Sequence, residues 1–147
     1  MNVVRCAANI EPMPLRFTTA QIDAPLLADP LLLQRELLGH LLEARPGLRA
    51  CYPLPYLPWV VLDSTRLAAP FRFDVVAAHR TFLVLRFDVA PGFFRQADIA
   101  RVLSDTRLES MARWELLATP AYGDAWLQAR TFDGSGEWRH AFWNETA

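Results

Sequence analysis

The run Phe71-Arg72-Phe73-Asp74-Val75, matched further along the chain by Leu85-Arg86-Phe87-Asp88-Val89, decides the fold that the sequence predicts. Both runs contain Arg-Phe-Asp-Val, and a turn near residues 79 to 81 would pair them as an antiparallel hairpin. Arg72 then lies opposite Asp88 and Asp74 opposite Arg86, while the apolar residues share the other face. A slip of one residue would break both patterns, so this register is the sharpest structural prediction.

Two helices are predicted on either side of this hairpin. In the first, Asp29 suits an N-cap and Pro30 the first helical position, and leucine-rich sequence continues through Leu42 to a stop at Pro46. One apolar stripe at helical spacing is made by Leu33, Leu37, Leu38, Leu41 and Leu42. The second helix is predicted over residues 93–104, after Pro91 and Gly92.

Further strands are predicted over residues 3–10, 59–62, 111–118, 124–132 and 137–143, and residues 52–59 are predicted to be a proline-rich extended loop. This order predicts a single α+β domain over residues 1–147, with a mostly antiparallel sheet and two main helices. The order is compatible with a duplicated βαββ or ferredoxin-like arrangement. A cone-shaped, NTF2-like sheet is the alternative.

Composition excludes several classes of function. The chain has 147 residues, of which 52% are hydrophobic, enough for one core. A net charge of −1 argues against nucleic acid as a partner. All 15 basic residues are Arg, which indicates a GC-rich, bacterial coding bias and leaves no lysine for Schiff-base chemistry. We expect a cytoplasmic protein without a membrane segment, because no signal sequence or long apolar run is present.

Neither a metal site nor a cofactor site is predicted. Cys6 and Cys51 are expected to be free buried thiols, and the histidines His40, His79 and His140 lie in separate segments. His140 is the best candidate for a general base, yet no motif supplies a nucleophile or an orienting carboxylate. Phosphate-binding glycine loops are absent. We therefore assign no catalytic residue.

Aromatic residues carry the prediction of a binding surface. Several tryptophans fall in the last three predicted strands, where alternation prevents all of them from pointing into the core. Two more aromatics lie in and after the proline-rich loop. The predicted binding residues are Trp126, Arg130, Trp138, His140, Trp143, Tyr56 and Trp59.

The sequence favours a non-catalytic cytoplasmic binding protein of the adaptor, immunity or assembly-factor type. Its partner would be another protein or a second copy of the chain, docked on an aromatic, arginine-rich sheet face. The alternative is a small-molecule-binding domain or small enzyme with a pocket around His140 and the C-terminal tryptophans. A contiguous apolar surface would support the first function, and a concave site with a few convergent polar groups the second.

Overall fold

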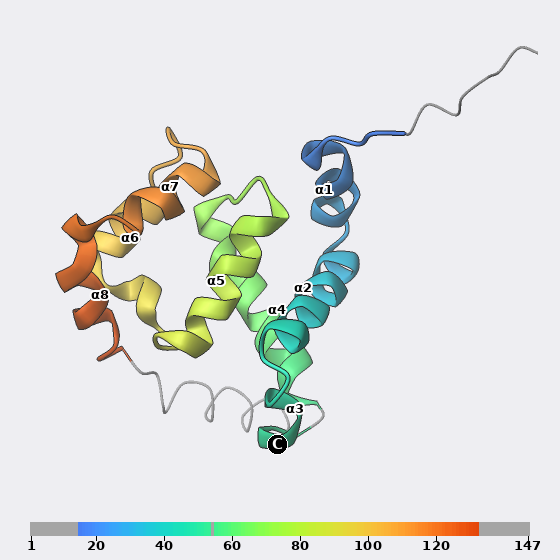
Figure 1. Ribbon diagram of the computed structural model, residues 1–147, viewed down its shortest axis with the longest axis horizontal. Coiled ribbons are helices and arrows are strands. Elements are labelled where there is room, and N and C mark those ends of the chain that lie inside the picture. The colour runs from blue at the N-terminus through green and yellow to red at the C-terminus, as the bar shows by residue number, and fades with distance from the viewer. Residues whose placement is uncertain (1–14, 54, 133–147) are drawn as a thin grey trace, which may run out of the picture.

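The computed structural model describes residues 15–53 and 55–132, and this part of the chain is helical throughout, with no strand (Figure 1). The predicted α+β fold with an antiparallel sheet is therefore wrong. The elements are α1 (Thr19–Ala28), α2 (Pro30–Ala44), α3 (Leu48–Cys51), α4 (Tyr56–Ala68), α5 (Val76–Asp88), α6 (Ala97–Leu103), α7 (Ser110–Leu117) and α8 (Gly123–Ala129), with short 3-10 helices η1 (Ala69–Phe71), η2 (Phe93–Arg95) and η3 (Pro120–Tyr122).

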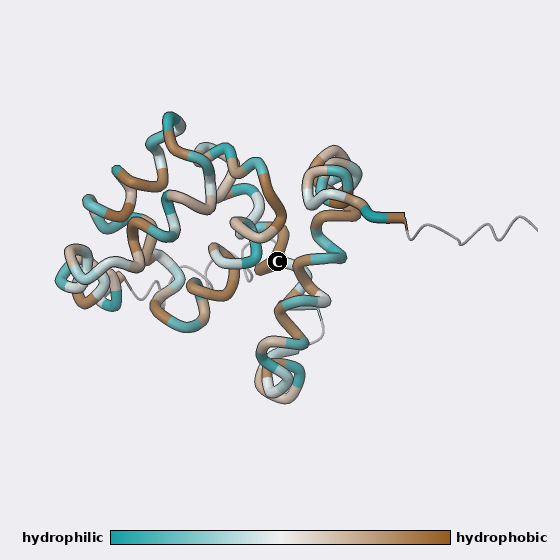
Figure 2. The backbone as a smooth tube through the Cα atoms, turned by 45° about the horizontal axis from the view of Figure 1, so that its top comes forward, coloured by the Kyte–Doolittle hydropathy of each residue, from teal (hydrophilic) through white to brown (hydrophobic). Residues whose placement is uncertain are grey.

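Helix α5 lies between two hydrophobic cores. Helices α1, α2 and α3 lie on one side of it and α6, α7 and α8 on the other, as both views show (Figures 1 and 2). Val76 and Leu83 belong to the first core, whereas Ala78 and Phe82 belong to the second. At 100° per residue these two sets lie about 130° apart around the helix. Helix α5 thus buries two different faces.

The predicted hairpin over residues 71–89 is wrong for this reason. Side chains at i and i+2 point to nearly opposite sides of a helix, as they do in a strand. When a helix is buried on both sides, its apolar residues no longer repeat every three to four positions, so the sequence loses the helical pattern. The expected charge pairs are absent: Asp88 pairs with Arg45 and Arg86 with Asp63, while Asp74 accepts a hydrogen bond from Ser110. The repeated Arg-Phe-Asp-Val string therefore does not mark two paired strands.

Three other predicted strands are helices. Residues 59–62 lie within α4, residues 111–118 overlap α7, and residues 124–132 overlap α8. The predicted loop over residues 52–59 ends early because Pro58 lies in the first turn of α4, where a missing N–H costs no intrahelical hydrogen bond. The strands predicted over residues 3–10 and 137–143 lie outside the described residues.

The two predicted helices are present. Helix α2 begins at Pro30, and the Asp29 carboxylate accepts hydrogen bonds from the backbone N–H groups of Leu31 and Leu32, at 2.9 and 3.4 Å. The second prediction, residues 93–104, divides into η2 and α6, because Gln96 is extended and caps α6 through its side chain.

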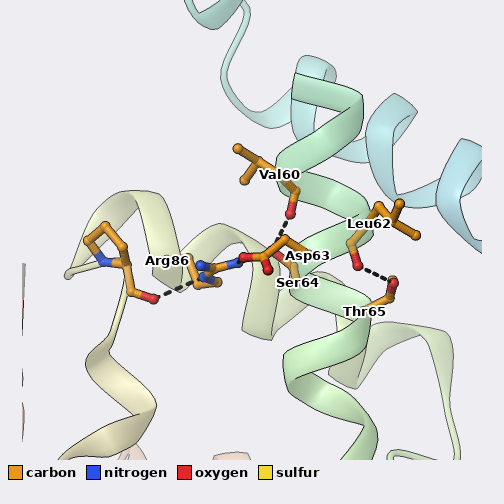
Figure 3. A network of polar contacts seen from close by, with 7 residues as sticks. Val60, Leu62, Asp63, Ser64, Thr65 and Arg86 are labelled. Carbon is orange, nitrogen blue, oxygen red and sulfur yellow. Dashed lines mark hydrogen bonds and ion pairs between the residues drawn. The ribbon is translucent and has the colours of Figure 1, made fainter. Parts of the chain in front are cut away.

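Two buried arginines link the elements. Arg86 is 1% exposed, and from α5 it donates to Asp63 (3.0 Å) and Ser64 (2.7 Å) on α4 and to the Pro91 carbonyl (2.9 Å), as Figure 3 shows in part. Burial lowers the pKa of Arg86 and Asp63 opposes the shift. Because the guanidinium group is a very strong base, Arg86 stays charged at neutral pH.

The second buried arginine, Arg113, lies on α7 and joins three turns of the chain. Its guanidinium donates to the backbone carbonyls of Phe71 and Leu103, both at 2.6 Å, and to that of Leu108 at 3.1 Å. It also lies over the Phe73 ring, with 5.6 Å between the guanidinium carbon and the ring centroid. Arg113 therefore provides a charged hydrogen-bond donor for three backbone carbonyl groups that would otherwise lack a partner.

Asp23 docks α1 on α5. The first N–H groups of a helix have no partner within that helix, and Val75, the N-cap residue of α5, offers no side-chain acceptor. Asp23 supplies this acceptor from a distant part of the sequence: its carboxylate is nearly buried and accepts a hydrogen bond from the Val76 N–H at 2.9 Å.

No helix among the described residues is long and apolar enough to cross a membrane.

Candidate functional site

Two adjoining surface hollows lie between α2, α3 and the start of α4. One has a volume of about 280 Å³ and the other of about 450 Å³, and they share Leu42 and Arg49 as lining residues. We call the pair the α2–α4 hollow. Its lining is made of Leu38, Gly39, Leu42, Glu43, Pro46, Arg49, Tyr52, Pro53, Leu57 and Pro58.

The wall of the hollow on α2 results from the width of its leucine stripe. Leu33, Leu37 and Leu41 are buried in the first core, whereas Leu38 and Leu42 lie next to them around the helix and are half-buried. At 100° per residue, the second pair is displaced by about a third of a turn from the first set. These two leucines pack on the core with one side and line the hollow with the other.

Gly39 is the most informative residue of this wall. It lies in the interior of α2, where glycine costs about 0.5–1 kcal/mol relative to alanine. A Cβ atom built at this position would meet no atom within 4 Å, so close packing inside the described chain does not require glycine. The helix therefore presents bare backbone to the hollow without a structural need for it.

The opposite wall is held in place by stacked aromatic rings. Tyr52 stacks on Tyr56 with 5.0 Å between ring centroids, and Tyr56 stacks on Trp59 at 6.2 Å. The edge of Phe87 from α5 meets Tyr52 at 6.3 Å. The Tyr52 ring is therefore fixed before any ligand arrives, which lowers the entropy cost of binding.

Two polar contacts hold α2 against its neighbouring helices. The Gln34 amide donates to the Pro58 carbonyl at 3.1 Å and ties α2 to the first turn of α4. Arg45, at the end of α2, forms a two-pronged ion pair with Asp88 of α5. The first contact therefore joins the two walls of the hollow, and the second joins α2 to α5.

Charge in the hollow comes from Arg49 and Glu43. Both side chains are exposed, and within the described ranges Arg49 makes no hydrogen bond or ion pair. The remaining lining is apolar except for the Tyr52 hydroxyl. An apolar surface beside one unpaired guanidinium suits an apolar ligand that carries a carboxylate, and it offers no set of acid, base and nucleophile.

The structure separates the predicted binding residues. Tyr56 is buried and Trp59 half-buried, so both support the hollow from behind. Trp126 is also half-buried, stacks on Phe93 at 5.8 Å and donates to the Leu117 carbonyl at 2.7 Å. Arg130 is exposed at the end of α8. The predicted residues Trp138, His140 and Trp143 lie outside the described part.

A second polar cluster has a structural role. The Ser110 hydroxyl donates to the Asp74 carboxylate, and its oxygen accepts from the Asp74 N–H at 3.0 Å and from Arg113 at 3.3 Å. The hydrogen bond from Ser110 lowers the pKa of Asp74. Because the hydroxyl already serves three partners within the fold, it is not available as a nucleophile.

Sequence reasoning missed the hollow, although one signal was present. Gly39 interrupts a run of good helix formers, and its exposed position could have marked a functional surface.

Cys51, predicted to be a buried thiol, is an exposed free thiol on α3. Among the described residues, no three His, Cys, Asp or Glu side chains group as metal ligands.

Comparison with protein-family models, curated proteins and solved structures finds no match to this chain. Its function therefore has to be inferred from the hollow.

Proposed function

We propose that this chain is a non-catalytic binding protein of the adaptor or assembly-factor type, which docks an apolar segment of a partner protein in the α2–α4 hollow. The partner segment carries large apolar side chains and a carboxylate next to them. The apolar side chains lie against Leu38, Leu42 and Tyr52, and the carboxylate pairs with Arg49. The sheet face predicted from the sequence has no part in this proposal.

The observation that carries the proposal is Gly39. This glycine lowers the stability of α2, and no neighbouring atom within the described chain requires it. It also lines the hollow. A glycine in such a place is expected where the backbone of another molecule must approach closely. The unpaired charge of Arg49 at the same hollow favours a partner of opposite charge.

The proposal is tested by selecting peptides from a random displayed library on the full-length protein and measuring their affinity by fluorescence anisotropy. Selected peptides should share large apolar residues beside Asp or Glu. Leu42→Glu should weaken binding by at least about tenfold, since an apolar contact worth 1.5–3 kcal/mol is lost. Arg49→Glu should weaken it by about fivefold or more.

Gly39→Ala separates a binding role from a structural one. It should raise the melting temperature by about 1–4 °C, because alanine is the better helix former by about 0.5–1 kcal/mol. It should also weaken peptide binding, because the new methyl group fills the space next to the backbone. Greater stability with lower affinity is not expected from a residue that only supports the fold.

The matched control is Leu127→Glu, since Leu127 is 62% exposed on α8. This variant should bind the peptides like the unchanged protein. If peptides lose affinity in Leu127→Glu and keep it in Leu42→Glu and Arg49→Glu, the hollow is not the docking site. The alternative function, a small-molecule pocket around His140, stays a prediction because His140 lies outside the described residues.

A further inference from the structure

We infer that the partner docked on α2 is a second copy of this chain, and that the two copies pack their α2 helices antiparallel across Gly39. This inference rests on the proposed function, because it names the partner that enters the α2–α4 hollow. The exposed face of α2 is complementary to itself in charge, since Arg35 lies four residues before Gly39 and Glu43 four residues after it. Such a face suits a dimer with twofold symmetry.

Gly39 lies at the centre of the exposed face of α2. The buried stripe of this helix is made of Leu33, Leu37 and Leu41. At 100° per residue, Gly39 is displaced by about 160° from the middle of that stripe. Helices α1, α2 and α3 follow one another along one edge of the molecule (Figure 1), and Gly39 itself is exposed. A second helix can therefore approach the described part of the chain at this point.

The shape of this face favours a crossing at Gly39. Residues four apart form a ridge along a helix, and the ridge on the exposed face contains Leu31, Arg35, Gly39 and Glu43. Gly39 leaves a gap in the ridge because it has no side chain. Two copies that meet at Gly39 bring their gaps together, so the two backbones can approach more closely than ridges of full side chains would permit.

Charge selects the antiparallel arrangement. With Gly39 at the crossing point, antiparallel helices place Arg35 of each copy opposite Glu43 of the other, which gives two equivalent ion pairs. Parallel helices would instead place like charges opposite each other. Both side chains are exposed, and within the described ranges neither makes a hydrogen bond or an ion pair. Both are therefore available to a second copy.

The same symmetry brings the first turn of α2 to the hollow. In antiparallel helices the beginning of one lies beside the end of the other, and the larger part of the hollow extends from Gly39 to Pro46 along the end of α2. Leu31 and Leu42 are eleven residues apart, which places them within about 20° of each other around the helix. A twofold axis perpendicular to both helices keeps this side in common, so Leu31 of the second copy lies beside Leu42.

The first turn of α2 has the chemistry that the hollow requires. It exposes two large apolar side chains, since Leu31 is 70% and Leu32 38% accessible to solvent. Asp29 supplies a carboxylate next to them. This carboxylate accepts both backbone hydrogen bonds of its cap through Oδ1, which leaves Oδ2 for Arg49 of the second copy. One helix face with its hollow is a small interface, so we expect a reversible dimer with a dissociation constant on the order of 10 µM.

Analytical ultracentrifugation of the full-length protein tests this dimer, at concentrations from about 1 to about 300 µM. The unchanged chain should pass from monomer to dimer over this range. Arg35→Glu and Glu43→Arg should each raise the dissociation constant by at least about tenfold, because each creates two pairs of like charges. The double variant Arg35→Glu/Glu43→Arg should return to within about threefold of the unchanged chain, since both pairs form again with their charges exchanged.

Recovery in the double variant reports a contact between copies. Residues 35 and 43 are eight positions apart on one helix, or about 12 Å along its axis, and are not neighbours within the chain. Gly39→Gln should prevent dimerisation and leave the fold intact, because a Cβ atom at this position meets no atom within 4 Å. Glu115→Arg, on the exposed side of α7, is the matched control and should dimerise like the unchanged chain. Thermal unfolding verifies that each variant is folded.

Three outcomes overturn the inference. The first is a chain that stays monomeric over the whole range. The second is a dimer that Gly39→Gln and both charge reversals leave unchanged, because the copies then meet elsewhere. The third is a folded double variant that fails to recover dimerisation, because Arg35 and Glu43 are then not opposite each other.

Peptide binding distinguishes this inference from the proposed function. If the chain is monomeric and its selected peptides lose affinity in Leu42→Glu, the docking site stands and a second copy is not its partner. Peptides that ignore Leu42→Glu and Arg49→Glu overturn the proposed function, whatever the oligomeric state. If both proposals hold, an excess of a selected peptide should convert the dimer to monomer, because the peptide and the first turn of α2 occupy the same hollow.

Discussion

At the scale of single residues, His79 is a largely buried group whose protonation should affect stability. It lies on α5, its ring meets Phe73 edge-on at 5.3 Å between centroids, and its Nδ1 atom is buried without a hydrogen-bond partner. Burial lowers the pKa of His79, and the nearby Phe73 backbone opposes this shift only in part. The folded protein therefore keeps this imidazole neutral to lower pH than the unfolded chain does.

The sign of the pH dependence follows. The unfolded imidazole, with a pKa near 6.5, takes up a proton first, so the unfolded state gains relative stability as the pH falls below about 6.5. Between pH 7.5 and 5.5 the loss of unfolding free energy from His79 can reach about 1.4 kcal/mol. Urea unfolding at both pH values should show the loss, and His79→Phe should remove it. His40→Gln is the control, and an equal pH dependence in His79→Phe would refute this assignment.

At the scale of helices, Asp23 caps a helix to which it does not belong. Asp23→Ala should lower the free energy of unfolding by about 0.5–2 kcal/mol, as loss of an N-cap does, because the Val76 N–H would be left without its acceptor. The amide protons of α1 should also exchange faster, since the contact between α1 and α5 is lost. Urea unfolding and hydrogen exchange measure the two effects.

Asp29→Ala is the matched control for this prediction, because Asp29 caps its own helix α2 at the surface. It should lose a comparable amount of stability without the same increase of exchange in α1. If Asp23→Ala left exchange in α1 unchanged, the carboxylate would not be what docks that helix.

Helix α2 could be predicted from the sequence and α5 could not, for physical reasons. Helix α2 has one buried face, a local cap at Asp29 and a stop before Pro46, and each of these signals is contained in neighbouring residues. Helix α5 has two buried faces and receives its cap from Asp23, far away in the sequence. Local pattern therefore could not distinguish α5 from a strand.

The candidate site was hidden for a related reason. Leu38 and Leu42 have the same composition and spacing as core leucines, and only the tertiary structure shows that one side of each faces a hollow. Two of the predicted binding residues, Tyr56 and Trp59, lie behind this hollow in the aromatic stack, and their part in binding stays a prediction. Trp126 was assigned to a surface sheet and instead packs in the second core.

At the scale of the whole molecule, the shared helix α5 should make the two cores unfold together. Phe82 packs in the second core and Leu83 in the first, and both are essentially inaccessible to solvent. Phe82→Ala should cost about 3–5 kcal/mol and Leu83→Ala about 2–5 kcal/mol. Each loss should appear in both cores, because α5 cannot unfold on one side only.

Fluorotryptophan NMR in urea measures this coupling. The signal of Trp59 reports on the first core and that of Trp114 on the second, and the two transitions should coincide in the unchanged protein and in both variants. Separate midpoints, with each variant shifting only its own core, would show that the cores are independent units.

The position of α5 between two cores also has an evolutionary consequence. A substitution on a helix with one buried face is tolerated if it suits one set of neighbours, whereas most changes on α5 alter the packing on one side or disturb the Arg86 contacts to α4 and Pro91. We therefore expect α5 to accumulate substitutions more slowly than the other helices as the protein diverges. The surface of α3 can change with each new partner, so related chains would keep the central helix and differ most in what they bind.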